Sequence, residues 1–392
     1  MKLDRIESRS ILDTRGKPTI ETTLYAGALS ATASVPSGKS TGSHEAKELR
    51  DADGGVNTAI AHVVGEIASA LTARDFATPD ALDEFLIALD GTSDKSRLGA
   101  NAILSVSIAA QRLFAQAEGV PLWKAIAMRA GTTPAAPRLY MNVMNGGAHA
   151  DFRLPFQEHI LVCEGAPSEA FATAKAAFAA LGKRLGDVPM GDEGGYAPSF
   201  DTLDAPFDLL MELVGQYPGT SIAIDAAATE LRHGDTYKLI GTEYTSDELV
   251  RLYEDLVARY ALHSIEDPFS EDADSDFTKL TAALSGKCLV VGDDFTVTNP
   301  LRIAHAIEEQ SINAVLIKPN QIGTVKEALA AVQATYAAGW EVICSHRSGE
   351  TGDTFIADFA YGVGAHGIKA GGLGQRERVV KYERLVEIEK EV

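Results

Sequence analysis

The sequence predicts an α/β fold in which a smaller α+β domain, residues 1–130, precedes a β/α barrel, residues 131–392. Three observations support this prediction. The chain of 392 residues is long enough for two domains, and 45% of its residues are hydrophobic, which suffices for a sizeable core. Before residue 130, short β-like runs mix with alanine-rich helical segments. After it, strand-like and helical segments alternate, which predicts parallel strands closed into a barrel.

The first domain is expected to begin with strands and continue with helices. Residues 19–25 alternate in polarity, as a half-buried strand does, and residues 30–35 form a second β-like run. Alanine-rich helical segments follow to about residue 125. The stretch GTTPAAP that starts at Gly131 has the composition of a linker, and we place the domain boundary there.

Beyond residue 140, short β-branched runs end in a charged or polar residue, and a helical segment usually follows. Capping boxes at Thr245 and Thr324 predict where two of these helices begin. The carboxyl ends of parallel barrel strands meet at one face, and that face carries the active site. The expected strand-end residues are Asp225, Glu266, Asp293, Lys318, His346 to Ser348, and Lys369.

Three of these positions are acidic and belong to consecutive predicted strands. Asp225, Glu266 and Asp293 would repel one another at one rim unless a cation lay between them. Carboxylate oxygens are hard ligands, and they suit Mg²⁺. The sequence therefore predicts a magnesium site at this rim.

The next three strand ends are basic. Lys318, Arg347 with its neighbours His346 and Ser348, and Lys369 point to an anionic ligand, and Arg347 suits bidentate contact with phosphate or carboxylate. An alternative stays open, in which these cations pair with the acids opposite.

Two further acidic segments complete the candidate site. Glu193 lies in the glycine-rich turn GDEGG, and Glu158 follows Gln157 within a strand-like run. A lysine held neutral by neighbouring positive charge could remove a proton α to a carboxylate. Glu193, with Glu158 nearby, could protonate a departing β-hydroxyl, so the residues together describe a β-elimination of water.

Composition excludes several other classes of function. The net charge of −20 disfavours binding to nucleic acid or to anionic membrane surfaces. We find no apolar run of about 20 residues, and the N-terminus MKLDRIESRS carries acidic residues where a signal peptide would be apolar. We therefore expect a cytoplasmic protein without a membrane span.

At this point the sequence resembles the enolase family along nearly its whole length. The matching motifs, in chain order, are SILDTRGKPTIET, VPSGKSTGSHEAKELRD, LGANAILSVS, MNGGAHA, FQEHI, GDEGGYAP, SIEDPF, VGDDFTVTNP, LIKPNQIGT, SHRSGETGDTFIAD and IKAG. The resemblance implies an α+β N-terminal capping domain and a modified β/α (TIM-like) barrel, assembled as a homodimer or a higher homo-oligomer. It implies two Mg²⁺ ions per active site and a small phosphorylated carboxylate as substrate.

The resemblance also implies a role for each site residue. The first Mg²⁺ would be held by Asp225, Glu266 and Asp293, and the second by Ser40 together with the substrate phosphate. Lys318 would be the general base and Glu193 the general acid, supported by Glu158 and Gln157. The remaining residues would bind substrate: His149, His346, Arg347, Ser348 and Lys369.

The implied activity is the reversible dehydration of 2-phospho-D-glycerate to phosphoenolpyruvate through a Mg-stabilised enolate. Two departures from the family pattern keep alternatives open: Lys39 replaces a usual alanine, and residues 370–376 are atypical. One alternative is a paralogue acting on a related phosphorylated or phosphonate hydroxy acid, and another is a non-catalytic binding protein on this fold. For Lys39 itself, we leave open a contact with the phosphate or a solvent-exposed position.

Overall fold

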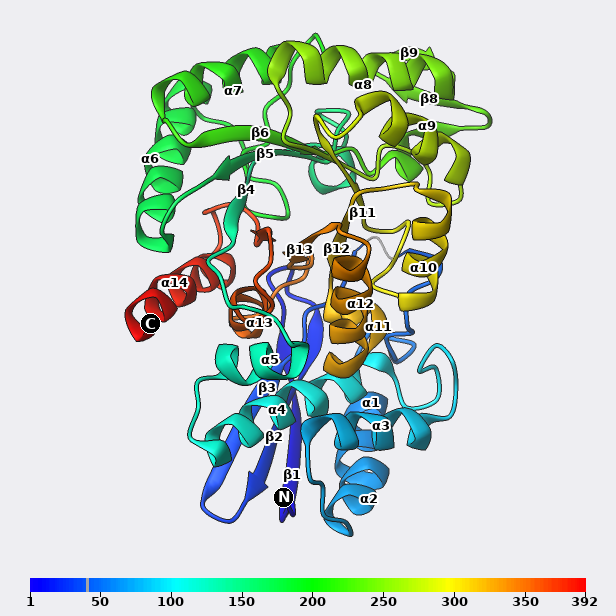
Figure 1. Cartoon of the computed structure of the whole chain (residues 1–392), viewed down its shortest axis with the longest axis vertical. Helices are drawn as coiled ribbons and strands as arrows, with labels where there is room; N and C mark the ends of the chain where they lie inside the picture. The colour runs from blue at the N-terminus through cyan, green and yellow to red at the C-terminus, as the bar shows by residue number, and fades with distance from the viewer. Residues whose placement is uncertain (40–41) are drawn as a thin grey trace.

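The computed structural model describes residues 1–39 and 42–392. In Figure 1, the N-terminal elements form the lower part of the molecule and the barrel forms the upper part. The N-terminal elements are β1 (Arg5–Leu12), β2 (Pro18–Ala26), β3 (Leu29–Ser34), α1 (Asn57–His62), the π-helical segment η1 (Val63–Ile67), α2 (Ala68–Thr72), α3 (Pro79–Asp90), α4 (Ala100–Glu118) and α5 (Leu122–Ala130).

The N-terminal sheet has the order β1-β2-β3, with both pairs antiparallel. Helix α4 packs against β2 and β3, and its small residues allow a close approach that buries Ile20 and Leu24. A hydrogen bond of 2.7 Å between Thr22 Oγ1 and Ser105 Oγ joins sheet and helix. The two predicted strands are confirmed as β2 and β3. Strand β1 was not predicted, because its sequence, RIESRSIL, does not alternate regularly between apolar and polar residues.

The barrel part contains the remaining strands and helices. They are β4 (Arg138–Asn145), the 3-10 turn η2 (Gly147–Ala150), β5 (Glu158–Cys163), α6 (Pro167–Leu185), α7 (Ala205–Gln216), β6 (Thr220–Asp225), the 3-10 turn η3 (Ala228–Leu231), β7 (Arg232–His233), β8 (Thr236–Leu239), β9 (Thr242–Tyr244), α8 (Ser246–Tyr260), β10 (Ser264–Glu266), α9 (Asp274–Leu284), β11 (Leu289–Gly292), α10 (Pro300–Glu309), β12 (Ala314–Ile317), α11 (Pro319–Ile322), α12 (Val325–Ala337), β13 (Glu341–Ser345), α13 (Phe355–Val363), β14 (Gly367–Lys369) and α14 (Arg376–Glu391).

Eight of these strands close into a barrel in the order β10-β11-β12-β13-β14-β4-β5-β6. This confirms the predicted fold class, an N-terminal α+β part followed by a β/α barrel. The domain limits 1–130 and 131–392 stay a prediction. The capping box predicted at Thr245 is confirmed and starts α8, and Thr324 accepts a hydrogen bond from the Glu327 backbone at the start of α12.

One strand departs from the parallel arrangement that we expected. Strand β5 runs antiparallel to both β4 and β6. The link from β4 to β5 contains the short turn η2 but no α-helix, and a parallel connection usually crosses over through an α-helix. The reversal has a functional consequence, because Glu158, the first residue of β5, lies opposite Asn145 and Asp225 at the rim where the other strands end.

The N-terminal part also contacts helix α12, which follows β12 and the short helix α11. In the first turn of α12, the Val325 backbone N–H donates to Ser107 Oγ at 3.0 Å, and the Lys326 N–H donates to Asp83 Oδ2 at 3.0 Å. Free N–H groups at a helix start need such acceptors. Contacts between the two parts thereby fix the segment that follows Lys318.

Every helix within the described ranges is too short or too polar to cross a membrane.

Candidate active site

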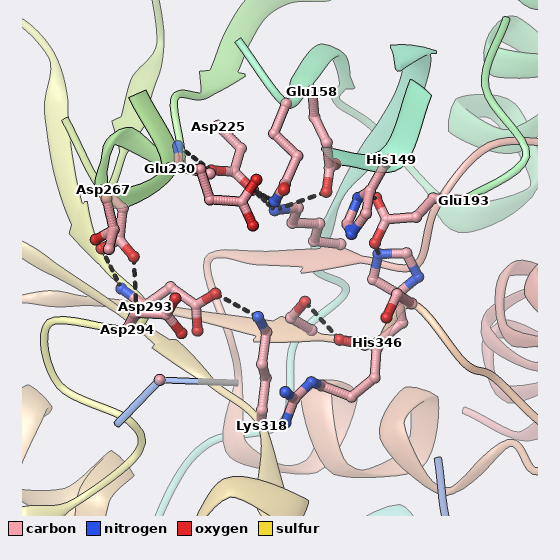
Figure 2. Close-up of a pocket in the computed structure, with 18 of the residues that line it drawn as sticks. His149, Glu158, Glu193, Asp225, Glu230, Asp267, Asp293, Asp294, Lys318 and His346 are labelled. Atoms are coloured by element: carbon pink, nitrogen blue, oxygen red, sulfur yellow. Dashed lines mark hydrogen bonds and ion pairs between the residues drawn. The ribbon is translucent and has the colours of Figure 1, made fainter. Parts of the chain in front are cut away.

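A cavity of about 190 Å³ opens at the carboxyl-terminal rim of the barrel. The residues that line it come from almost every barrel strand. Figure 2 shows Glu158 and Glu193 on one side of this pocket and Lys318 on the opposite side. The lining is strongly polar, so the pocket suits a small charged ligand rather than an apolar one.

Lys369 is the centre of one charge cluster in this pocket. Its ammonium lies 3.0 Å from Asp225 Oδ2, 2.7 Å from Glu266 Oε1 and 3.1 Å from Glu158 Oε1. Burial alone would lower the pKa of Lys369, but these carboxylates outweigh it and raise the pKa well above its usual value. Burial and the charge on Asp225 together raise the pKa of Glu266.

Lys318 and Asp293 form a second ion pair, which is largely shielded from solvent, and Gln321 Nε2 donates to Asp293 Oδ1 at 2.9 Å. Burial opposes both charges, yet the ion pair raises the pKa of Lys318 and lowers the pKa of Asp293. This arrangement differs from the neutral lysine that we expected. The negative charge of Asp293 outweighs the effect of the neighbouring cations Arg347 and Lys369 on the lysine.

Glu193 and Glu158 form the acidic side of the pocket. Asn142 Nδ2 donates to Glu193 Oε2 at 3.1 Å, and His149 Nδ1 lies 3.4 Å from the same oxygen. Burial and the charge of Glu193 raise the pKa of Glu158 well above its usual value, although Lys369 opposes this. Burial would also raise the pKa of Glu193, but the charges of His149 and His346 outweigh it and lower that pKa well below its usual value. Opposite shifts are expected for two adjacent buried carboxyls that hold one proton between them.

Arg347 makes a contact that the sequence did not reveal. Its guanidinium donates two hydrogen bonds to Glu45, each 2.9 Å long, and both side chains are buried. Beside it, Arg15 donates to Ser348 Oγ at 3.4 Å. Residues of the N-terminal part therefore complete the rim at the position where we expected the substrate phosphate.

The pocket offers carboxylate and amide oxygens, which are the donor atoms that a divalent cation such as Mg²⁺ binds. Asp225, Glu266 and Asp293 are all buried. Burial and the negative charges of Asp225 and Asp293 raise the pKa of Glu266, which shows that the three carboxylates repel one another. Within residues 1–39 and 42–392, the buried atoms Glu158 Oε2 and Gln157 Oε1 have no hydrogen-bond partner. Buried oxygen ligands of this kind are those that Mg²⁺ prefers.

The structure brings most of the predicted residues together but groups them unexpectedly. Lys369 joins Asp225 to Glu266, whereas Asp293 pairs with Lys318. Two sets of described residues have potential ligand atoms within 4.8 Å of one another: His149, Glu158 and Glu193, and Asp267, Asp293 and Asp294. Lys318 and Lys369 pair with the predicted acids, as in the alternative left open by the sequence, whereas Arg347 pairs with Glu45. Ser40 lies outside the described residues.

Our sequence interpretation missed several residues of this rim. Asp267 and Asp294 each follow a predicted acid directly, in SIEDPF and GDDF, and that doubling could have indicated them. The Asp267 carboxylate accepts hydrogen bonds from the backbone N–H groups of Asp293 and Asp294, at 2.9 and 2.8 Å. It thereby shapes the loop that presents Asp293. Nothing in the local sequence indicated Glu45 or Arg378.

Lys39 is exposed to solvent, as one of the two interpretations that we left open expects, and it also forms an ion pair. Its ammonium lies 2.6 Å from Asp192 Oδ2 and donates to the Ala148 carbonyl at 3.0 Å. It therefore connects the segment before residue 40 with two loops that carry His149 and Glu193.

Comparison with known proteins covers both parts of the chain. Residues 3–126 match the family model described as the enolase N-terminal domain, and residues 134–392 match the enolase C-terminal TIM barrel domain. The chain is 42% identical to the enolase of Methanopyrus kandleri over 412 residues, covering 99% of this chain and 95% of that protein. It is 43% identical to the enolase of Acidothermus cellulolyticus over 410 residues, covering 100% and 94%.

Proposed function

Since this chain belongs to the enolase family, we propose how its own residues divide the work of the family's reaction. The protein is a carbon–oxygen hydro-lyase, a phosphopyruvate hydratase, which interconverts 2-phospho-D-glycerate and phosphoenolpyruvate. The observation that carries the proposal is that a partly buried lysine and a buried pair of carboxyls line opposite sides of one cavity. Neither alternative is favoured, because the full-length relatives are enolases and the described acids and bases are all present.

The enolase family implies a divalent cation, and we assign it to the carboxylates of Asp225, Glu266 and Asp293. Mg²⁺ is the proposed ion, with two per site, and Ser40 is the proposed ligand of the second. When bound, the metal supplies positive charge that offsets the negative charge gained by the substrate carboxylate. The buried, mutually repelling carboxylates support this assignment.

Lys318 is the proposed general base that removes the α-proton. Asp293 serves both as its ion-pair partner and as a proposed metal ligand, so metal binding competes with the ion pair for one carboxylate. Release of the lysine from Asp293 favours the neutral amine, since burial and the nearby Arg347 and Lys369 lower its pKa.

Glu193 is the proposed general acid, and Glu158 shares its proton. The geometry that supports this role is the contact of Glu193 with Asn142 and His149, which orients its carboxyl into the cavity. A departing hydroxide is a poor leaving group, so protonation by a positioned carboxylic acid accelerates its loss.

The anionic groups of the substrate are assigned to the remaining polar residues of the pocket. Arg347 and Ser348 are proposed to bind the phosphate, and Lys369 the carboxylate side. The other proposed contacts are His149, Gln157 and His346. We also propose a cytoplasmic homodimer or higher homo-oligomer, as the family resemblance implies.

A direct assay tests this proposal. Purified protein is mixed with Mg²⁺ and 2-phosphoglycerate, and enol-pyruvate absorbance is followed. We expect turnover that stops when excess chelator is added. Turnover of a related phosphonate hydroxy acid but not of 2-phosphoglycerate would favour the paralogue instead.

A further inference from the structure

A fully buried arginine on the last helix contacts the imidazole of His346. The guanidinium of Arg378, on α14, lies within hydrogen-bond distance of His346 Nδ1 through its Nη1 atom. A guanidinium carries only donors and stays protonated in proteins. His346 Nδ1 must therefore accept this hydrogen bond, and the proton of the neutral imidazole lies on Nε2.

Arg378 is held in this orientation by further hydrogen bonds. Its Nη2 donates to the Ser348 carbonyl at 2.8 Å and to the Asp192 carbonyl at 2.9 Å. Its Nη1 also donates to the Arg347 carbonyl at 3.1 Å, and its Nε donates to Gln375 Oε1 at 2.6 Å. These acceptors come from three separate segments of the chain, so the guanidinium cannot turn away from His346 without losing several of them.

The other nitrogen of His346 faces the proposed acid. His346 Nε2 lies 3.7 Å from Glu193 Oε1, and this nitrogen has no hydrogen-bond partner within the described part of the chain. We propose that Arg378 is a positioning residue that keeps His346 neutral, with its proton on the Nε2 atom facing Glu193. The expected effect on catalysis rests on the proposed function, whereas the protonation state of His346 does not depend on it.

The charges around His346 agree with the neutral form. Arg378, Lys369 and Lys318 face the imidazole with positive charge, and Glu193 faces it with negative charge. Burial and the charge of Arg378 lower the pKa of His346 well below its usual value, and Glu193 only partly opposes them.

The neutral form matters for the acid beside it. Burial favours a protonated Glu193, but positive charge on His149 and His346 outweighs burial and lowers the pKa of that carboxyl well below its usual value. An imidazolium at His346 would thus remove the proton that a general acid must hold. A neutral His346 can instead donate a hydrogen bond from Nε2 without supplying that charge.

The test combines spectroscopy with kinetics on the full-length protein. In ¹⁵N-histidine-labelled parent protein, His346 is assigned by the signals that disappear in His346→Gln. We expect an unprotonated Nδ1 and a protonated Nε2 between about pH 6 and pH 8. In Arg378→Met, we expect the imidazole to take up a proton within this range. Arg378→Lys keeps a cationic donor, so it should restore the neutral form in part.

Kinetics supply the second readout. We expect Arg378→Met to lower kcat by about tenfold or more with a smaller change in KM, and the loss should be greater at pH 6 than at pH 8. Arg384→Met is the matched control, because Arg384 lies on the same helix and pairs with Asp358 instead. The control should leave both the His346 signals and the pH dependence of kcat unchanged.

Several outcomes would overturn the proposal. A protonated Nδ1 or an imidazolium at His346 in the parent protein contradicts it directly, and this measurement stands even if Arg378→Met fails to fold. A pH-independent loss of kcat in Arg378→Met, with unchanged His346 signals, would also refute it. If the parent lacked dehydratase activity but showed the expected tautomer, the proposed function would fail while this inference held.

Discussion

The two ends of the barrel are built on the same strands but carry opposite chemistry. At one end, His263 and His366 precede β10 and β14, and their Nε2 atoms lie 2.9 Å apart. At the other end, the same strands finish at Glu266 and Lys369, which are joined by an ion pair of 2.7 Å. Three-residue strands therefore separate a histidine pair from the charged catalytic rim.

Burial has opposite results at the two ends. It lowers the pKa of both histidines to about 4, and each is therefore neutral at pH 7. At the rim, burial disfavours the charged forms of Lys318 and Lys369, but their carboxylate partners outweigh it and both lysines stay charged. Between the ends lies an apolar layer that includes Tyr140, Val291 and Leu316. The difference teaches that, of the two strand ends compared, the rim keeps buried charge because pairing and a bound cation can compensate it, whereas the opposite end keeps neutral imidazoles.

Breaking the charged end at a proposed metal ligand should have the largest effect. We expect Asp293→Asn to weaken Mg²⁺ binding by about 100-fold or more and to abolish most turnover, because the proposed site loses one of three carboxylates. Titration calorimetry with Mg²⁺ measures the first effect and the absorbance assay the second.

The control for this prediction is Asp235→Asn, which removes an exposed acid elsewhere in the barrel part. Parent-like Mg²⁺ affinity in Asp293→Asn would show that the metal is held elsewhere, such as by His149, Glu158 and Glu193.

The neutral histidines His263 and His366 should make the stability of the protein depend on pH. In the unfolded chain a histidine binds its proton near pH 6.5, whereas His263 and His366 in the folded protein do so near pH 4. Unfolding therefore takes up protons in this window, and stability should fall as the pH decreases from about 6.5 to 4. His366→Gln should remove about one proton from that uptake.

Thermal unfolding midpoints measured across this window test the prediction. The exposed His233 offers a matched control, and His233→Gln should retain the parent slope. The same slope in His366→Gln as in the parent would mean that the histidine pair titrates normally.

The smallest effect is expected at Lys39. Its contact with Asp192 is partly exposed, and exposed ion pairs contribute little. Lys39→Ala should raise KM by less than about fivefold, and the difference from the parent should shrink at high salt. Lys39→Arg, which keeps the charge, serves as the control. A large loss of kcat in Lys39→Ala would give this lysine a direct role in the chemistry.

Much of the rim could be predicted because strand ends follow a local pattern. Asp225, Glu266 and Lys369 close their strands, and Asp293 and Lys318 come directly after theirs. A repeating strand and helix unit brings such residues to one face of a barrel whatever the rest of the chain does. The pattern of apolar and polar residues was therefore sufficient to find them.

The missed features depend on contacts between distant segments. Glu45 pairs with Arg347, which is 302 residues away in the chain, and no local pattern encodes such a contact. The antiparallel direction of β5 goes with a preceding link that lacks a crossover helix, and the composition of the strand itself does not indicate it. Arg378 belongs to an ordinary helical segment, and only the fold shows that it is buried against His346.

The division of labour between Lys318 and Glu193 is the central claim, and exchange of the substrate α-proton with solvent deuterium tests it most directly. Lys318→Ala should lose this exchange, because the proposed base is gone. Glu193→Gln should retain measurable exchange while losing dehydration by about 100-fold or more, since only the second step needs the acid. Equal loss of exchange in both variants would contradict the assigned roles.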